Sequence, residues 1–379
     1  MINRNDILKP QSWSKVVFGD VVRNVDETVR DPQNSGLERY VGLEHIDPGS
    51  LHIQRWGLIS EGTSFTRRFR KGQVLFGKRR AYQRKVAVAE FDGLCSSDIL
   101  VFQPKDDRLL PELLPFICQS DGFFEHALDT SAGSLSPRTK FKELARYKFP
   151  LPPLDEQRRI AEILWAADDL FTMWKLTDLK IQLSIKSLIS NFLNQKWPLC
   201  ELAKVGEIVT GATPPTKNSE YYQGGDILFI GPSDFNGNKY IKNAAKKITK
   251  RGLDVVRSIP KNAVMVTCIG LIGKVALSDS LCATNQQINS IICNETCDPL
   301  FLYFVLSTLT DELNKNASCS VVPILNKSNM ATIKIPLPPR KDQIKFLEKI
   351  HYFEGTKQNI QNHICILSRL RDSLVNNWF

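Results

Sequence analysis

The stretch FPLPPLDEQRRIAEIL, Phe149 to Leu164, places three prolines directly before a helical pattern. A second version of this arrangement, IPLPPRKDQIKFLEKI, follows at Ile335 to Ile350. Proline restricts its own backbone and that of the preceding residue, so each run predicts an extended approach that leads into a helix. Carboxylates then stand in the first helical turn, at Asp155, Glu156 and Asp342, where the helix dipole favours negative charge. The chain therefore carries the same hinge and the same helix start twice.

The two hinges are offset by 186 residues, and other pairs match at nearly the same offset. Repetition on this scale indicates a tandem duplication with small insertions. The matching pairs are SLSP at Ser134 to Pro137 with SVVP at Ser320 to Pro323, LCSSD at Leu94 to Asp98 with LCATN at Leu281 to Asn285, and FGDVV from Phe18 with VGEIV from Val205.

Each half follows one plan. Strand-rich sequence such as KGQVLFG and NAVMVTCIG comes first, followed by the hinge and then a long helical pattern. This order predicts an α+β fold with two tandem mixed α/β domains, each followed by a long helix. The predicted segments are residues 1–149 (first domain), 150–196 (first hinge and helix), 197–335 (second domain) and 336–379 (second hinge and helix).

A heptad pattern runs through both helices, with nine of ten seam positions apolar in the first and eight of ten in the second. A seam of this length predicts that the two helices form a coiled coil. Because each helix emerges from the end of its own domain, we expect the pair to be antiparallel, with pseudo-twofold symmetry between the halves. The alternative is that each helix packs on its own domain. A helix of forty residues would be about 60 Å long. The first helix contributes Ile160, Leu164, Ala167, Phe171, Trp174, Asp178, Ile181, Ile185, Leu188 and Phe192, and the second contributes Phe346, Ile350, Phe353, Lys357, Ile360, Ile364, Leu367, Arg371, Leu374 and Trp378.

Three of these seam positions, Asp178, Lys357 and Arg371, are charged. Polar seam residues can fix the register of a coiled coil, and that is the interpretation we favour. The alternative is that these side chains are partly exposed.

The composition is that of a soluble globular protein, with 42% hydrophobic and 24% charged residues. The sequence contains no apolar run long enough to cross a membrane and no signal-peptide core, so we expect a cytoplasmic protein without a membrane partner. The nine cysteines are an odd, scattered set, which favours reduced thiols. Cys293 and Cys297 have no second cysteine pair or histidine cluster nearby, so no metal site is predicted.

The net charge of +10 is concentrated in particular stretches. Residues 62–89 contain nine cations and no acidic residue. Lysine and arginine bind phosphates, while arginine and glutamine can also form paired hydrogen bonds with base edges. This stretch favours a nucleic-acid surface over a merely solvated strand-and-turn face. The candidate DNA-binding residues are Arg67, Arg68, Arg70, Lys71, Lys78, Arg79, Arg80, Tyr82, Gln83, Arg84 and Lys85.

The second half has a basic run of its own between Lys239 and Arg251, also without an acidic residue. Nearby, ATNQQINS at Ala283 to Ser290 is rich in amides, which could read base edges or could equally cap turns. Because the halves share a plan but differ here, two different half-sites are predicted. The candidates in this half are Lys239, Lys242, Lys246, Lys247, Lys250, Arg251, Asn285, Gln286 and Gln287.

No catalytic signature accompanies these runs. CIGLIGKVA at Cys268 to Ala276 lacks both the spacing of a phosphate-binding loop and the hydroxyl residue that should follow Lys274. Nucleotide-binding glycine loops, zinc spacings, adenine-methyltransferase tetrapeptides and nuclease carboxylate motifs are also missing. We therefore expect a chain that binds but does not catalyse.

The ordered set of motifs resembles the specificity subunit of type I restriction–modification systems. The resemblance rests on the duplicated PLPP…Q hinge, on YVGLEHID at Tyr40 to Asp47, and on GEIVTGATPP at Gly206 to Pro215. It covers nearly the whole chain. It implies two target recognition domains that each read one half of a split, asymmetric sequence in double-stranded DNA, with paired helices setting the gap.

The same resemblance implies partners. Two adenine-N6 methyltransferase subunits that bind S-adenosylmethionine would dock on the hinge and coiled-coil residues, and two restriction subunits with ATP-driven translocation can join them. S-adenosylmethionine, ATP and magnesium would then belong to the partners, with no cofactor in this chain. The alternatives are a stand-alone DNA-binding regulator, an enzyme acting on nucleic acid, and a structural coiled-coil adaptor.

Overall fold

The computed structural model describes residues 13–133, 136–318 and 322–379. Parts of the repeated SLSP and SVVP motifs, and Cys319, lie outside the described residues. The chain divides into two compact units, Met1–Asp178 with Ile360–Phe379 and Leu179–Asn359. Both long helices contribute to both units, so the four predicted segment boundaries stay predictions. Each unit combines sheets with helices, which confirms the predicted mixed α/β class.

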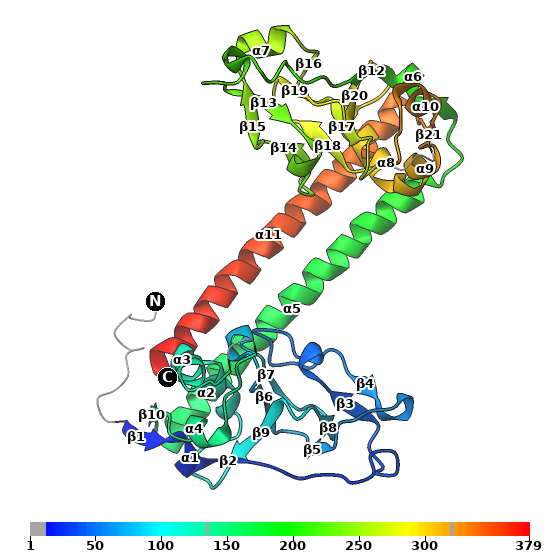
Figure 1. Cartoon of the computed structure of the whole chain (residues 1–379). Coiled ribbons are helices and arrows are strands. Elements are labelled where there is room, and N and C mark those ends of the chain that lie inside the picture. Colours follow the sequence, from blue (N-terminus) through cyan, green and yellow to red (C-terminus); the bar gives the residue numbers. More distant parts are fainter. Residues whose placement is uncertain (1–12, 134–135, 319–321) are drawn as a thin grey trace. The chain divides into compact units, whose positions relative to one another are not determined.

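The first unit is built on two four-stranded sheets and one two-stranded sheet, all labelled in Figure 1. The first sheet has the order β2 (Val22–Asn24), β9 (Ile99–Pro104), β6 (Val74–Gly77), β7 (Val86–Val88). The second has the order β4 (Gly57–Leu58), β3 (Arg39–Val41), β8 (Gly93–Cys95), β5 (Arg67–Phe69), and β1 (Ser14–Val17) pairs with β10 (Lys148–Leu151). The short helices are α1 (Phe18–Val21), α2 (Leu114–Gln119), α3 (Asp121–Asp129) and α4 (Phe141–Leu144).

The second unit repeats this topology strand for strand. Its first sheet has the order β12 (Gly206–Thr210), β20 (Ile288–Cys293), β17 (Val264–Thr267), β18 (Val275–Ser278), extended by β14 (Tyr240–Ile241). Its second has the order β15 (Lys246–Ile248), β13 (Ile227–Ile230), β19 (Cys282–Thr284), β16 (Ser258–Ile259), and β11 (Leu199–Glu201) pairs with β21 (Lys334–Pro336). The helices are α6 (Leu202–Val205), α7 (Lys250–Asp254), α8 (Pro299–Thr308), α9 (Thr310–Lys315) and α10 (Lys327–Ala331). The duplication therefore holds at the level of sheet order.

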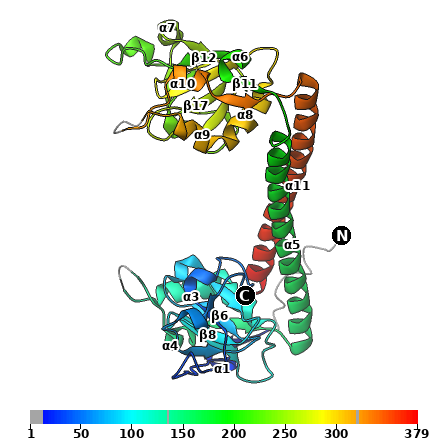
Figure 2. The same ribbon diagram turned by 90° about the vertical axis from the view of Figure 1, so that its right-hand side faces the viewer.

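The two long helices, α5 (Leu154–Leu193) and α11 (Arg340–Trp378), pack against each other within each unit. In the first unit the Trp174 ring stacks on His363 at 5.0 Å, and Asp168 bonds Arg371, so residue numbers rise along one helix as they fall along the other. In the second unit Phe192 stacks on Phe346 at 4.5 Å. The pairing is antiparallel, as predicted, and it can be seen within each unit in both views (Figures 1 and 2).

Every predicted seam position is buried or half-buried. Arg371 is buried at 5% exposure despite its charge, and its partner Asp168, which the heptad did not include, is buried at 1%. The fully buried seam residues are Ile160, Leu164, Phe171, Phe346, Ile350, Ile360, Arg371 and Trp378, and the half-buried ones are Ala167, Trp174, Asp178, Ile181, Ile185, Leu188, Phe192, Phe353, Lys357, Ile364, Leu367 and Leu374.

The repeated hinge glutamine has a structural role in both units. The Gln157 amide nitrogen donates to the carbonyls of Arg108 and Pro152 at 2.7 and 2.9 Å, and its oxygen accepts from the backbone N–H of Leu110 at 2.9 Å. Gln157 is only 1% exposed, so its own amide group depends on these three bonds rather than on water.

Gln343 makes the same three bonds in the second unit. Its nitrogen donates to the carbonyls of Thr296 and Pro338, both at 2.9 Å, and its oxygen accepts from Asp298 N–H at 2.8 Å. The hinge motif therefore ties the start of each long helix to the loop that enters α2 or α8.

Each unit also ties its strands to its long helix by an ion pair. In the first unit His52 lies between Glu90 at 2.8 Å and Asp168 at 3.1 Å, and Asp168 also pairs with Arg371 at 2.9 Å. The hydrogen bond to Asp168 is the largest effect on the pKa of His52, which is raised to about 9.

In the second unit Lys239 pairs with Glu354 at 2.7 Å. Glu354 stands 186 residues after Asp168, at the equivalent helical position, whereas Arg371 corresponds to the apolar Ile185. The ion pair between strands and helix is thus shared, but only the first unit buries an additional arginine beside it.

Candidate nucleic-acid interface

Three loops of the first unit meet at one end of its sheets; we refer to residues 78–85, 96–98 and 136–139 as the first loop cluster. Backbone hydrogen bonds hold it together: Lys78 N–H donates to Asp98 O at 3.0 Å, Arg80 N–H to Pro137 O at 2.8 Å, and Thr139 N–H to Lys78 O at 3.0 Å. These bonds connect segments that are far apart in the sequence, so the loops form one continuous surface.

The cationic side chains of this cluster are arranged around one carboxylate. Arg138 Nε donates to Asp98 Oδ1 at 2.9 Å, and Arg79 Nη1 to Asp98 Oδ2 at 3.2 Å. Arg79 Nε also donates to Ser136 Oγ at 2.6 Å. Burial raises the pKa of Asp98, but the hydrogen bonds from Arg138 and Arg79 lower it more, so the pKa lies below its ordinary value.

Three further cations of the cluster have no ion pair among the described residues, namely Lys78, Arg80 and Lys85. Burial lowers the pKa of Lys78, and the charges of Arg67 and Arg138 lower it further. With Arg79, Arg138 and only Asp98 as counter-charge, the cluster is strongly positive. A positive surface of this kind suits a polyanion.

The turn between β6 and β7 is strained. Arg80 and Arg84 flank a short 3-10 turn (Ala81–Gln83), and their φ values are 54° and 52°. Residues other than glycine seldom adopt this left-handed backbone conformation. Strain of this kind is often found at functional sites. Tyr82, between them, is 55% exposed.

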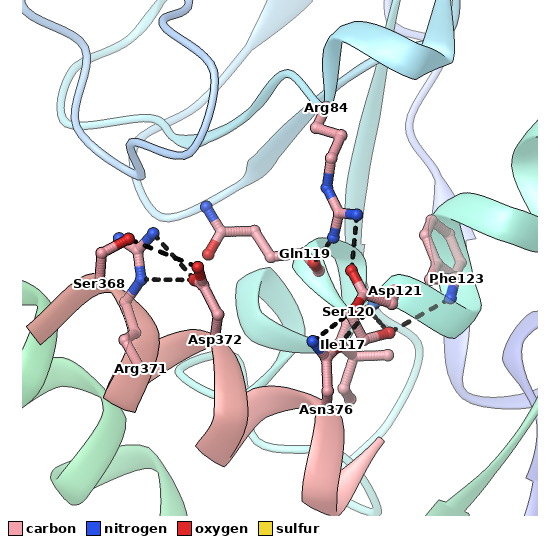
Figure 3. Close-up of polar contacts among 10 residues, drawn as sticks. All are labelled: Arg84, Ile117, Gln119, Ser120, Asp121, Phe123, Ser368, Arg371, Asp372 and Asn376. Atoms are coloured by element: carbon pink, nitrogen blue, oxygen red, sulfur yellow. Dashed lines mark hydrogen bonds and ion pairs between the residues drawn. The ribbon is translucent and has the colours of Figure 1, made fainter. Parts of the chain in front are cut away.

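Arg84 lines a polar pocket of about 590 Å³ and points toward Asp121 (Figure 3). It pairs with Asp121 at 2.6 Å, donates to Gln119 O at 2.9 Å and lies over the Phe124 ring. Asp121 is held in turn by Asn376, near the end of α11. Arg84 therefore links the turn to the helices of the same unit.

The second unit builds the same frame from different side chains; we refer to residues 268–274, 285–287 and 322–325 as the second loop cluster. Cys268 N–H donates to Gln287 O at 2.8 Å, Gly270 N–H to Pro323 O at 3.1 Å, and Leu325 N–H to Cys268 O at 2.9 Å. These three bonds reproduce those of Lys78, Arg80 and Thr139. The frame of the site is therefore duplicated.

This equivalence corrects the sequence alignment of LCSSD with LCATN. Cys95 pairs with Val41 in the parallel ladder, and Thr284 holds the same place beside Ile230. Asp98 therefore corresponds to Gln287 rather than to Asn285. The loop of the second unit is two residues farther along than the shared letters suggested, because a common cysteine does not fix the register of a strand.

Amide side chains form the polar part of the second loop cluster. Asn285 Nδ2 donates to Gln287 Oε1 at 3.1 Å, and Gln286 Oε1 accepts from Thr213 Oγ1 at 2.8 Å. Ile269 and Ile324 form the same backbone bridge as Arg79 and Arg138. The predicted amides thus meet in one place, beside apolar residues.

The structure places acidic residues beside five of the nine cations of the first basic run. These acids come from other segments, so the run is less positive in space than in sequence. The pairs are Arg67–Asp26, Arg68–Glu27, Arg70–Glu27, Arg79–Asp98 and Arg84–Asp121. Of the remaining candidates, Lys71 is exposed, Gln83 lines the pocket beside Arg84, and Lys85 donates to Leu43 O.

The second basic run divides in a similar way. Lys239, Lys250 and Arg251 pair with Glu354, Asp254 and Glu220 respectively. Lys242, Lys246 and Lys247 are exposed and have no ion pair within the described residues. The last two lie on β15, which pairs with β13, and β13 in turn pairs with β19, the strand that directly precedes Asn285.

Sequence reasoning missed Asp98, Ser136 and Arg138. None of them lies in a basic run, and their role depends on which loops meet. A signal was present, since Arg138 directly follows the SLSP motif that marks the repeat.

No group of three or more histidine, cysteine, aspartate or glutamate side chains in the described part of the chain is placed to hold a metal ion. The eight described cysteines are free thiols. A hydrogen bond with Cys293, together with burial, raises the pKa of Cys297 well above its ordinary value. Over the same residues, no helix combines the length and apolar character of a membrane span.

Known proteins resemble this chain throughout. The family described as type I restriction modification DNA specificity domain matches residues 44–182 and 194–365. The HindI specificity subunit of Haemophilus influenzae is 32% identical, with 96% of this chain and 98% of that protein covered. The MjaIX specificity subunit of Methanocaldococcus jannaschii is 30% identical over 48% of this chain and 44% of that protein, about half of each.

Solved structures share the fold. The type I restriction–modification S subunit from M. genitalium has a TM-score of 0.61 at 12% identity and is covered to 98%, with 100% of this chain. The HsdS subunit from Thermoanaerobacter tengcongensis has a TM-score of 0.51 at 20% identity, with 98% of this chain and 97% of that one covered.

Proposed function

Because this chain belongs to the family of type I restriction–modification DNA specificity proteins, we propose that it recognises a bipartite, asymmetric DNA target and recruits the subunits that modify it. Each loop cluster contacts one half-site in duplex DNA. The chain itself supplies recognition, and adenine methylation and DNA cleavage belong to its partners.

One observation carries the proposal: two loop clusters with the same backbone frame bear different side chains. The first presents guanidinium and ammonium groups around Asp98, and the second presents amides and isoleucines. Hydrogen-bonding and apolar side chains distinguish base pairs in the major groove, so two such surfaces read two different sequences. A split, asymmetric target follows.

The long helices act as the spacer. A helix of 40 residues such as α5 is about 60 Å long, and a paired helix resists bending better than a single one. Half-sites centred roughly 34 Å apart, one duplex turn, would present the same face to both clusters. Insertion of one heptad into each helix should lengthen the non-specific spacer, and an unchanged spacer would contradict this role.

Two methyltransferase subunits that bind S-adenosylmethionine are the expected partners, and restriction subunits with ATP and magnesium can join them. The hinge glutamines are buried, so docking falls to exposed side chains on the helices. Support comes from large apolar residues exposed on α5, where Met173, Leu176, Leu179 and Leu183 are each about half exposed.

The test is a genome-wide map of methylated adenines, made by single-molecule sequencing with this gene intact and deleted. We expect one two-part motif to lose its methylation on deletion. An unchanged map would contradict the recruitment of a methyltransferase. Duplex binding by the purified chain should also weaken steeply with salt, and a flat response would contradict DNA recognition itself.

A further inference from the structure

We propose that Arg138, held in place by Asp98, reads a guanine in the half-site of the first loop cluster. This inference rests on the proposed function, since it assumes that the cluster binds DNA. It adds a specificity-determining residue that neither basic run contains.

The backbone fixes where Arg138 stands. Arg79 and Arg138 form an isolated antiparallel bridge, so their side chains are neighbours. Arg138 N–H also donates to Ala132 O at 2.9 Å, and Arg138 O accepts from Ala132 N–H at 3.0 Å. The position is therefore set by two loops rather than by one mobile turn.

Asp98 then fixes how Arg138 points. Its Oδ1 accepts from Arg138 Nε at 2.9 Å, while its Oδ2 accepts from Arg79 Nη1 at 3.2 Å. The carboxylate is only 16% exposed, so water competes weakly for it. A guanidinium held in this way loses little conformational freedom when it binds.

The N–H donors of Arg138 that remain free have a geometry that suits hydrogen bonds with a base. Arg138 uses only Nε, and its two terminal amino groups have no hydrogen-bond partner within the described residues. The side chain is 52% exposed. Two parallel donors match the O6 and N7 acceptors of guanine, the commonest specific contact that arginine makes in the major groove.

Arg79 is less suited to this role, because Ser136 and Asp98 already occupy its Nε and Nη1. Lys78 and Arg80 carry charge without a fixed orientation from a carboxylate, which suits phosphate contacts. The cluster therefore separates into one oriented base reader and cations that bind the backbone.

Two other roles for Arg138 give different results. A phosphate contact needs the charge of Arg138 but not its paired N–H donors, and a purely structural pair with Asp98 needs no DNA contact. Arg138→Lys separates base reading from both other roles, because it keeps the charge and removes the paired donors.

The experiment selects bound sequences from a library of duplexes randomised over both half-sites, using the intact chain. It compares the wild type with Arg138→Lys, Asp98→Asn and a control, Arg108→Lys. Arg108 is a matched control because it is 57% exposed and bonded to the Asp106 carboxylate, but lies outside both clusters.

We expect Arg138→Lys to abolish a preference for guanine at one position of one half-site, a loss of roughly 5- to 150-fold. The other half-site and the control should keep their preferences. Asp98→Asn should weaken the same guanine preference without affecting any other position. Hydrogen exchange of the intact variants would confirm that the unit remains folded.

Unchanged base preferences in Arg138→Lys would overturn the inference in favour of a structural pair or a phosphate contact. An equal loss of affinity for all sequences, with the base preferences kept, would also overturn it. Both results would leave the proposed function standing. If the wild type itself selects no sequence, the proposed function fails and the inference fails with it.

Discussion

The turn after β6 and the turn after β17 have the same backbone and almost no chemistry in common. Arg79, Arg80 and Arg84 of the first stand where Ile269, Gly270 and Gly273 stand in the second, with the same left-handed φ at the last two positions. Backbone hydrogen bonds to a neighbouring loop are kept in both. The duplication has thus conserved a frame and left the side chains free to differ, as a recognition surface requires.

The same contrast appears where strands meet the long helices. Both units place a cation of the strand region against a carboxylate at the same helical position, but only the first unit buries this carboxylate completely and adds Arg371. If the two units share a backbone frame and differ in side chains, substitutions at positions that both units share should change the stability of both units equally. Substitutions at positions that differ should change the stability of one unit only.

The largest effect should come from Arg371→Ile, which gives the first unit the residue that the second has in Ile185. Asp168 would keep His52 but lose the hydrogen bond from Arg371 to its buried Oδ1, so we expect a loss of about 3 kcal/mol in the first unit. Hydrogen-exchange mass spectrometry on the intact chain reports each unit separately.

The control for this variant is Lys239→Met in the second unit. Glu354 is 33% exposed there, so the loss should stay below about 1 kcal/mol. Adding Asp168→Leu to Arg371→Ile should recover much of the stability, because an apolar pair can replace a buried ion pair. Equal losses for Arg371→Ile and Lys239→Met would break the distinction between the two units.

The next effect should be equal in both units. Gln157→Leu and Gln343→Leu each remove one buried and two partly buried hydrogen bonds to the backbone, so we expect a loss of about 2–3 kcal/mol for each. Urea unfolding of each variant, with the exposed Gln223→Leu as the control, measures these losses. A difference of more than about 1 kcal/mol between them would mean that the hinges are not equivalent.

The sequence was sufficient to predict the parts of the fold that depend on local pattern and repetition. The hinge, the long helices, their antiparallel pairing and the mixed α/β class all follow from proline positions, heptads and the offset. It could not predict the group around Asp98, because that group depends on the register of three loops that meet only in the folded sheets. Nor could it predict that acids such as Asp26 and Glu27 pair with a basic run far along the chain.

A smaller effect should be a difference between the two units in how their stability depends on pH. The pKa of His52 is raised to about 9 in the fold, chiefly by the hydrogen bond to Asp168, against an ordinary value of 6.5. Protonated His52 therefore stabilises the first unit fully below pH 6.5, and this contribution is lost as the pH rises through 9. Burial raises the pKa of Tyr240, the neighbour of Lys239 in the second unit, from an already alkaline value, so Tyr240 gives no such change in that range.

Urea midpoints of the wild type and His52→Gln, followed from about pH 6 to pH 10, should converge as the pH rises. Tyr240→Phe is the control and should give a constant difference up to pH 9. A constant difference for His52→Gln as well would show that His52 does not act through its charge.

The smallest effect concerns the strained turn itself and should have the opposite sign. Arg80 adopts a φ of 54° where the second unit has Gly270 at 74°, and a left-handed backbone costs a residue with a side chain about 1–2 kcal/mol. Glycine also loses more freedom on folding, so Arg80→Gly should stabilise the first unit by only about 0.5–1 kcal/mol. Gly270→Ala should destabilise the second by a similar amount through its φ alone, because an added Cβ would meet only Val322 at 3.9 Å.

DNA affinity measured on the same Arg80→Gly protein should fall with the lost charge, so that stability and binding change in opposite directions. If Arg80→Gly instead destabilises the unit, the arginine side chain holds the turn in place, and the two turns share a backbone for different physical reasons.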